Sequence, residues 1–343
     1  MRTIFICYYS VVFTVAVVGN FFALVACYKN YSVSAAVILS YIASLASADL
    51  IFALLSIFDL VFFVNGSWVG GEAVCKIQGY LIETSYTASI LTLLAISYER
   101  KKAVSTQMLV RSHGVKRRHE LLKIIWVTAI LACGPLFYAY TVKVEGENSL
   151  CVNTAWGDIG RQVYYTIQAV ALFLLPIFIM VWAHVKIFKA LRHHIRTTSK
   201  TFALESFGSE NRKRAAVDKK KQRKVTKMLF VVTLAFCLCY LPFMCVRTVR
   251  YFLIYTSDVF WKFVQLLIFT QTAFNPVIYC FYGHLFKLSL QDVLHCRFDC
   301  FATENERRRL RGSSSGTSSS PNPNSNTFSI KHVKRGWSTS SLK

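Results

Sequence analysis

Charged and polar residues lie inside or at the ends of several long apolar stretches of this chain. Asp49 and Glu83 are acids within such stretches, and Arg247 is a base within another. The strings Tyr98–Lys101 and Asn275–Tyr279 each close an apolar stretch with polar groups. An ionisable group in a low-dielectric environment is costly unless it is paired, hydrogen-bonded or bound to a cation. The chemistry that these residue types can supply is therefore ion pairing and cation coordination.

The sequence lacks the patterns that catalytic chemistry usually requires. It contains no glycine-rich phosphate loop, no metal-spaced set of cysteines and histidines and no nucleophile elbow. We therefore predict that the chain is not an enzyme. The net charge of +23 could suit nucleic acid. In a membrane protein such a charge more simply attracts anionic inner-leaflet lipid and a cytoplasmic partner, so we expect no nucleic-acid binding.

Seven apolar runs are long enough to cross a bilayer, which requires about 20 residues of helix. Hydrophobic residues make up 54% of the chain, and the mean hydropathy is +0.40. Because backbone polar groups cannot be left bare in lipid, helices are expected. The sequence predicts an all-α membrane protein, a seven-transmembrane helix bundle over residues 4–283. The expected spans are about 4–28, 33–64, 75–105, 121–142, 161–195, 219–253 and 259–283.

Basic residues are concentrated in alternate connections between these runs. One side of the predicted membrane carries Lys101, Lys102, the basic block 186–227 and the arginines of the tail. The positive-inside rule places these connections in the cytoplasm. We therefore expect a multi-pass protein of the plasma membrane, with residues 1–3 as a very short extracellular N-terminus and a cytoplasmic C-terminus.

Two of the eleven cysteines are expected outside the lipid core, on the extracellular side. Cys75 opens the third span, and Cys151 lies in the second outer loop. Because the extracellular side is oxidising, we expect these two to form a disulfide. Residues 140–151 of the same loop alternate apolar and polar types, which is typical of a β-hairpin.

The C-terminal region carries signals of membrane attachment. Residues 284–296 have apolar side chains at helical spacing, which predicts a short amphipathic eighth helix on the membrane surface. Cys296 and Cys300 are candidate palmitoylation sites. Residues 297–343 are predicted to be a disordered cytoplasmic tail. Asn65 begins an N-glycosylation sequon on the outer side, close to the second span.

The ordered set of motifs resembles the rhodopsin-like (class A) G-protein-coupled receptors over about residues 5–300. One mark falls in each apolar segment or outer loop, in the family's order. The marks are Gly19-Asn20, Leu45–Leu50, Trp68, Gly71, Cys75, Glu99-Arg100, Trp126, Pro135, Pro176, Phe236, Cys239, Pro242, Asn275–Tyr279 and Phe286.

The resemblance implies roles for residues below the ligand pocket. Asp49, Ser89 and Asn275, with Asn20 nearby, would bind an allosteric sodium ion; no other cofactor is expected. Gln271 replaces a usual polar residue of that site. Ile90, Pro176 and Phe236 match the core trigger. The switch that couples to a G-protein would be formed by Glu99, Arg100, His184, Asn275, Pro276 and Tyr279.

The chain departs from the family pattern near Arg100. Lys101 replaces a tyrosine, and His184 also stands where tyrosine is usual. The base of the sixth span, around Gln222, offers no acid to pair with Arg100. A weaker inner restraint predicts raised basal signalling, and His184 predicts some pH sensitivity.

Residues at the expected ligand pocket argue against two known ligand classes. Ile82 stands where amine receptors have aspartate, and Phe269 stands where opsins have the retinal lysine. Arg247 suits a carboxylate or phosphate, or it pairs with Glu83 or Asp59. The pocket candidates by alignment with the family are Asp59, Gln78, Glu83, Tyr86, Tyr240, Phe243, Arg247, Lys262, Gln265 and Phe269.

We interpret the chain as a receptor of this type that binds an extracellular ligand, with a peptide favoured. The ligand would stabilise an open cytoplasmic cleft around Arg100 that activates a heterotrimeric G-protein. Receptor kinases, arrestin and membrane lipid are further expected partners. The alternatives are a receptor for a small anionic metabolite, nucleotide or lipid acid, and an atypical receptor that does not couple. A transporter or channel would show internal repeats, which are not seen.

Overall fold

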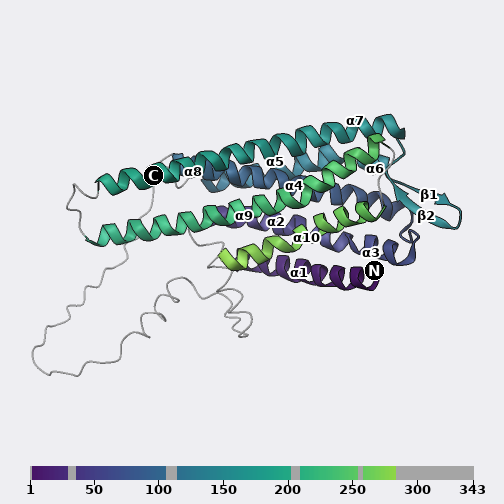
Figure 1. The fold of residues 1–343 in the computed structure, drawn as a ribbon, viewed down its shortest axis with the longest axis horizontal. Helices are drawn as coiled ribbons and strands as arrows, with labels where there is room; N and C mark the ends of the chain where they lie inside the picture. The colour runs from purple at the N-terminus through teal and green to yellow at the C-terminus, as the bar shows by residue number, and fades with distance from the viewer. Residues whose placement is uncertain (1, 30–35, 106–113, 202–208, 254–257, 283–343) are drawn as a thin grey trace, which may run out of the picture. The chain divides into compact units, whose positions relative to one another are not determined.

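The computed structural model describes residues 2–29, 36–105, 114–201, 209–253 and 258–282. Within them, seven helices are long and apolar enough to cross a membrane, which confirms the predicted seven-span architecture. Figure 1 shows the helices side by side in one bundle. The elements are α1 (Arg2–Lys29), α2 (Ala36–Leu55), α3 (Ile57–Asn65), α4 (Gly71–Ser105), α5 (Gly114–Cys133), α6 (Leu136–Ala139), β1 (Thr141–Glu145), β2 (Asn148–Val152), α7 (Gly157–Ala169), a π-helical turn (Val170–Leu174), α8 (Leu175–Thr201), α9 (Ser209–Leu253) and α10 (Asp258–Tyr282).

Helix α4 is the central element of the bundle. It packs against α2, α5, α8 and α9, and it is the most buried of the spanning helices. Its inward face carries a row of small hydroxyl residues together with Glu83. Polar side chains on this helix are therefore enclosed by the other helices, and the functional residues lie around them.

Helices α1 and α10 approach closely at Gly19. A Cβ atom added there would lie 2.8 Å from the Pro276 side chain, a separation that real Cβ atoms essentially never show. Glycine is therefore required by packing at this position. Pro276 lies inside α10, where it removes one backbone hydrogen bond and permits a bend.

The second predicted span, 33–64, is interrupted in the structure. Helix α2 ends at Leu55, and α3 begins at Ile57. The Ser56 hydroxyl donates to the Ala53 carbonyl at 2.7 Å and lies 2.6 Å from the Tyr9 hydroxyl. A serine side chain that bonds to the preceding turn competes with the backbone and bends a helix. The membrane span itself still runs from Leu39 to Asn65, so the break is a bend within one span.

The fourth predicted span, 121–142, extends past the helical part of this segment into strand β1. Helix α5 stops at Cys133, and Thr141 and Val142 already belong to strand β1. Pro135 has no N–H for a helical bond and disfavours helical geometry at the preceding Gly134. The chain makes only the short helix α6 before it becomes extended at Tyr140.

The outer loop forms the predicted β-hairpin. Strands β1 and β2 pair antiparallel, with Val142 opposite Cys151 and Glu145 opposite Asn148. Gly146 adopts a left-handed φ of 63° in the turn, a conformation that glycine adopts without a Cβ clash. The predicted eighth helix, the tail, Cys296 and Cys300 lie outside the described residues.

Candidate functional site

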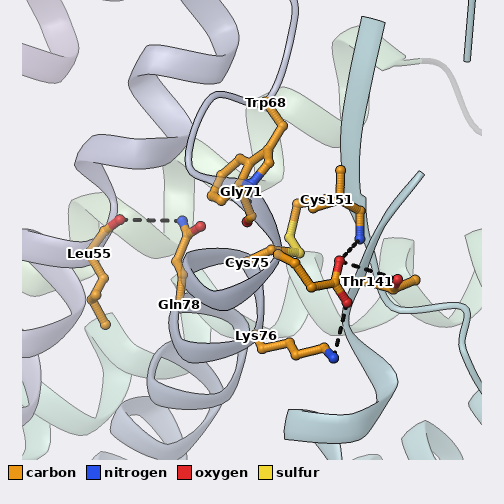
Figure 2. Close-up of a disulfide and its surroundings, with 10 residues drawn as sticks. Leu55, Trp68, Gly71, Cys75, Lys76, Gln78, Thr141 and Cys151 are labelled. Carbon is orange, nitrogen blue, oxygen red and sulfur yellow. Dashed lines mark hydrogen bonds and ion pairs between the residues drawn. A yellow bond between two sulfur atoms is a disulfide. The ribbon is translucent and has the colours of Figure 1, made fainter. Parts of the chain in front are cut away.

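The hairpin is fixed over one end of the bundle by a disulfide and by side chains from the α3–α4 region. Cys75 is bonded to Cys151, with their Cα atoms 5.6 Å apart, so the predicted pair is present (Figure 2). The Glu72 carboxylate accepts a hydrogen bond of 2.7 Å from the Val142 N–H, and it also pairs with Lys76. The hairpin is therefore attached to α4 by the Glu72 hydrogen bond as well as by the disulfide.

The first outer loop binds the other strand of the hairpin. The Trp68 N–H donates to the Ser149 carbonyl at 2.7 Å, and the Ser149 N–H donates to the Ser67 hydroxyl at 2.9 Å. The Trp68 indole donates in turn to the Gly71 carbonyl. Asn65, the sequon asparagine, is exposed at the end of α3. The loop and the hairpin thus form a single lid.

Glu83 and Arg247 form an ion pair beneath this lid. The Arg247 NH1 nitrogen lies 2.9 Å from Glu83 Oε1 and 3.3 Å from Oε2. Both side chains are almost fully buried. NH1 also donates to the Tyr86 hydroxyl at 3.1 Å. Of the alternatives that the sequence left open, pairing with Glu83 is the one that the structure contains.

Gln168 of α7 completes this cluster, and the sequence prediction missed it. Its amide nitrogen donates to Glu83 Oε2 at 2.9 Å, and its amide oxygen accepts from Arg247 NH2 at 3.0 Å. Tyr165 lies one turn away, with the Arg247 guanidinium 4.5 Å from its ring centre. The available signal was a glutamine within a charge-free run, since polar groups in lipid are rarely idle.

An aromatic stack leads from this cluster into the core. The Tyr86 and Tyr240 rings lie 5.7 Å apart, and Tyr240 stacks on Phe236 at 4.2 Å. Ile90 and Pro176, the other members of the predicted core trigger, are also buried. The π-helical turn Val170–Leu174 immediately precedes the α8 segment that contains Pro176, so the hydrogen-bond pattern is irregular there.

The remaining pocket candidates surround this cluster at different depths. Gln78 is buried and donates to the Leu55 carbonyl at the α2–α3 break. Phe269 stacks on Tyr9 at 4.5 Å, and Phe243 lies 5.6 Å from Trp261. The other three candidates, Asp59, Lys262 and Gln265, are exposed.

A second polar cluster lies in the middle of the bundle. Asn275 donates to Asp49 at 2.6 Å, although the two residues are 226 positions apart. Asn20 donates to the Thr272 carbonyl at 2.9 Å. The side-chain oxygens of Asn20, Gln271 and Asn275 are buried, and they have no hydrogen-bond partner among the described residues.

These oxygens fit a hard cation. A buried carboxylate with neutral amide and hydroxyl oxygens around it is the ligand type that such ions prefer, and Ser89 is buried on the neighbouring helix. If sodium bound here, Asp49, Ser89 and Asn275 would hold it, and the ion would neutralise the carboxylate.

Two of the predicted switch residues lie at the opposite end of α4 from the hairpin. Glu99 and Arg100 are half-buried in the last two turns of α4. The Lys101 ammonium lies 3.7 Å above the Trp182 ring on α8, a cation–π contact. Lysine at this position therefore joins α4 to α8, which an alignment could not reveal. Tyr279 is buried near this end of α10.

His184 joins α8 to α9. Its Nε2 lies 3.2 Å from the Thr233 hydroxyl, which donates its own proton to the Leu229 carbonyl at 2.9 Å. The hydroxyl must then accept from His184, so we assign the imidazole proton to Nε2. The predicted pH sensitivity of this residue stays a prediction.

A lidded outer cluster, a buried acid at mid-membrane and an arginine at the far end together define a seven-helix membrane receptor. The family model described as 7 transmembrane receptor (rhodopsin family) matches residues 19–279. The chain therefore belongs to this family, which confirms the resemblance. As a member of this receptor family it is not an enzyme.

Two relatives illustrate the similarity to receptors with named ligands. The QRFP-like peptide receptor of Branchiostoma floridae is 25% identical over an alignment of 309 residues, which covers 86% of this chain and 78% of the relative. The galanin receptor 2a of Danio rerio is 25% identical over an alignment of 297 residues, which covers 84% of this chain and 77% of the relative.

Proposed function

We propose that this receptor binds an extracellular peptide under the hairpin lid and activates a heterotrimeric G-protein through a cytoplasmic cleft around Arg100. It would act at the plasma membrane, with the hairpin outside. Family membership supports coupling, and the first relative is named as a peptide receptor. The observation that carries the ligand class is the Glu83–Arg247 pair.

The ion pair argues against a simple anion as the ligand. A receptor for a carboxylate or phosphate would present an unneutralised arginine, whereas Arg247 is already neutralised by Glu83 and hydrogen-bonded to Gln168 and Tyr86. An acid would have to displace Glu83 from a site with almost no water. A peptide can instead enter under the lid from the exposed rim, where Asp59 and Lys262 offer both signs of charge.

We also propose that sodium binds at Asp49 as an allosteric ion. The unsatisfied oxygens of Asn20 and Asn275 support this site. Receptor kinases and arrestin remain proposed partners of the activated receptor, together with membrane lipid around the spans.

The test is a panel of peptides, small acids and nucleotides applied to cells that express the receptor, with G-protein dissociation as the readout. We expect at least one peptide to respond and the acids and nucleotides to be silent. The Arg100→Ala variant, matched for surface expression, should bind the peptide without dissociating the G-protein. Responses to acids alone, abolished by Arg247→Glu, would favour the anion receptor. Peptide binding with no G-protein response in the wild type would favour a non-coupling receptor.

A further inference from the structure

We propose that Gln168 is the positioning residue of an outer latch, made of Glu83, Gln168 and Arg247, that holds α9 against α4 and α7 in the absence of ligand. The three side chains come from three different helices. The inference deepens the proposed receptor function, because it states how the ligand-free conformation is held. Its structural readout needs no G-protein.

The latch is a closed ring of hydrogen bonds. Arg247 donates to Glu83 at 2.9 Å and to the Gln168 oxygen at 3.0 Å, and the Gln168 nitrogen donates to Glu83 at 2.9 Å. An amide side chain presents a donor and an acceptor on two separate atoms at its tip without adding charge. Glutamine at 168 therefore fixes the separation and orientation of the pair in a way that an acid or a base could not.

Burial makes this ring a two-state element. The side chains of Arg247 and Glu83 are 3% and 7% exposed, and Gln168 is 2% exposed. Separating one member leaves an uncompensated charge out of water, which is strongly unfavourable. The ring is therefore either closed, or opened as a unit when water or ligand groups replace the lost partners.

Because of the position of Arg247, this local contact can restrain the movement of the long helix α9. Arg247 lies five residues after Pro242, within a helix α9 of 45 residues. A proline in a helix interior permits a bend, because it removes one backbone hydrogen bond. Tethering one arm of the helix at Arg247 limits the swing of the arm beyond Pro242.

The lid contacts the latch through aromatic residues. Asn153, two positions after Cys151, donates to the Tyr165 hydroxyl at 2.7 Å and to the Tyr251 hydroxyl at 3.0 Å. Tyr165 lies beneath the Arg247 guanidinium. A ligand that moves the loop after the disulfide therefore also moves the ring that supports Arg247.

The first variant is Gln168→Met, which keeps a similar volume and removes both amide hydrogen bonds. Its matched control is Thr166→Met, at an exposed threonine on the same helix α7. Spin labels on Lys102→Cys and Lys227→Cys, both exposed positions, report the distance between the far ends of α4 and α9. The exposed free cysteines Cys7 and Cys245 are removed first.

In nanodiscs without ligand, Gln168→Met should increase the population with the longer distance by about tenfold or more, the scale expected for the loss of a hydrogen bond to a charged group. The Thr166→Met control should match the wild type. A double variant, Glu83→Met with Arg247→Met, replaces the pair by apolar side chains that such sites tolerate, and it should show the same shift.

An unchanged distance distribution in the folded variants overturns the proposed latch. A fall in melting temperature alone does not rescue it, because lower stability would show only that the three residues contribute to folding. Basal G-protein activation measured on the same proteins should rise with the long-distance population. If the distances shift while G-protein activation stays at the level of empty membranes, the latch holds and the proposed coupling function fails.

Discussion

Polar side chains within the bundle gather into two sets with different electrostatic balance. The outer set, Glu83 with Arg247 and Gln168, is neutral and fully hydrogen-bonded. The middle set, Asp49 with Asn275, carries an acid without a basic partner among the described residues. A buried acid is tolerated if it is protonated or if it holds a cation. The two sets therefore predict different responses to ions.

Sodium should stabilise the purified receptor through Asp49. Binding to the folded state adds about 1.4 kcal/mol of stability at a concentration ten times the Kd. The melting temperature should therefore be higher in NaCl than in an equal concentration of KCl. The Asp49→Asn variant should lose this difference, whereas Asp59→Asn, at an exposed acid, should keep it. Equal melting temperatures of the wild type in the two salts would contradict sodium binding at Asp49.

Several residue contacts could be anticipated from the sequence, and others could not. The sequence marks Arg247 as a base in an apolar run, and it offers Glu83 as one of two acids that could pair with it. Gln168 was missed because a single glutamine forms no pattern. The contact of Lys101 with Trp182 could not be predicted either, since it depends on how α8 is rotated against α4.

At the scale of helices and strands, the lid and the α1–α10 contact show how local sequence sets packing. The hairpin was predictable because its apolar and polar residues alternate. The break at Ser56 and the early end of α5 were not predicted. Hydropathy alone does not register a serine within an apolar run or the residues around a proline as places where a helix bends or ends. The competition between side chain and backbone at such residues is visible only in the hydrogen bonds.

Removing the carboxylate of Glu72 should loosen the hairpin. Glu72→Ala leaves the Val142 N–H without its side-chain acceptor, so the strand loses its polar contact with α4. Hydrogen exchange should speed up at Val142 and through β1. The control, Glu120→Ala, removes an exposed acid paired with Lys123 on α5 and should leave the hairpin unchanged. Equal exchange in both variants would mean that the disulfide alone fixes the lid.

A larger residue at position 19 should separate α1 from α10. Gly19→Val places side-chain atoms where Pro276 already lies, and overpacking of this kind costs about 1–3 kcal/mol. Thermal unfolding of the purified protein should show the loss. Val11→Leu, on an exposed part of α1, serves as the control and should melt with the wild type. A stable Gly19→Val protein would contradict the close approach of the two helices.

At the scale of the whole molecule, helices α4 and α9 connect the two ends of one bundle. The hairpin and the outer latch lie at one end, and Arg100 lies at the other, with α4 and α9 common to both. The seven spans were predictable from hydropathy alone, because a membrane helix must be apolar over its full length. The pairing of residues across those spans was not, because hydropathy contains no information on rotation about the helix axis.

The receptor function requires that the two ends of the bundle face opposite sides of the membrane. Epitope tags placed before Met1 and after Lys343 should be stained in opposite ways on expressing cells. We predict that the first is accessible on intact cells and that the second requires permeabilisation. Staining of both tags on the same side of the plasma membrane would contradict a receptor that binds its ligand outside and presents Arg100 to the cytoplasm.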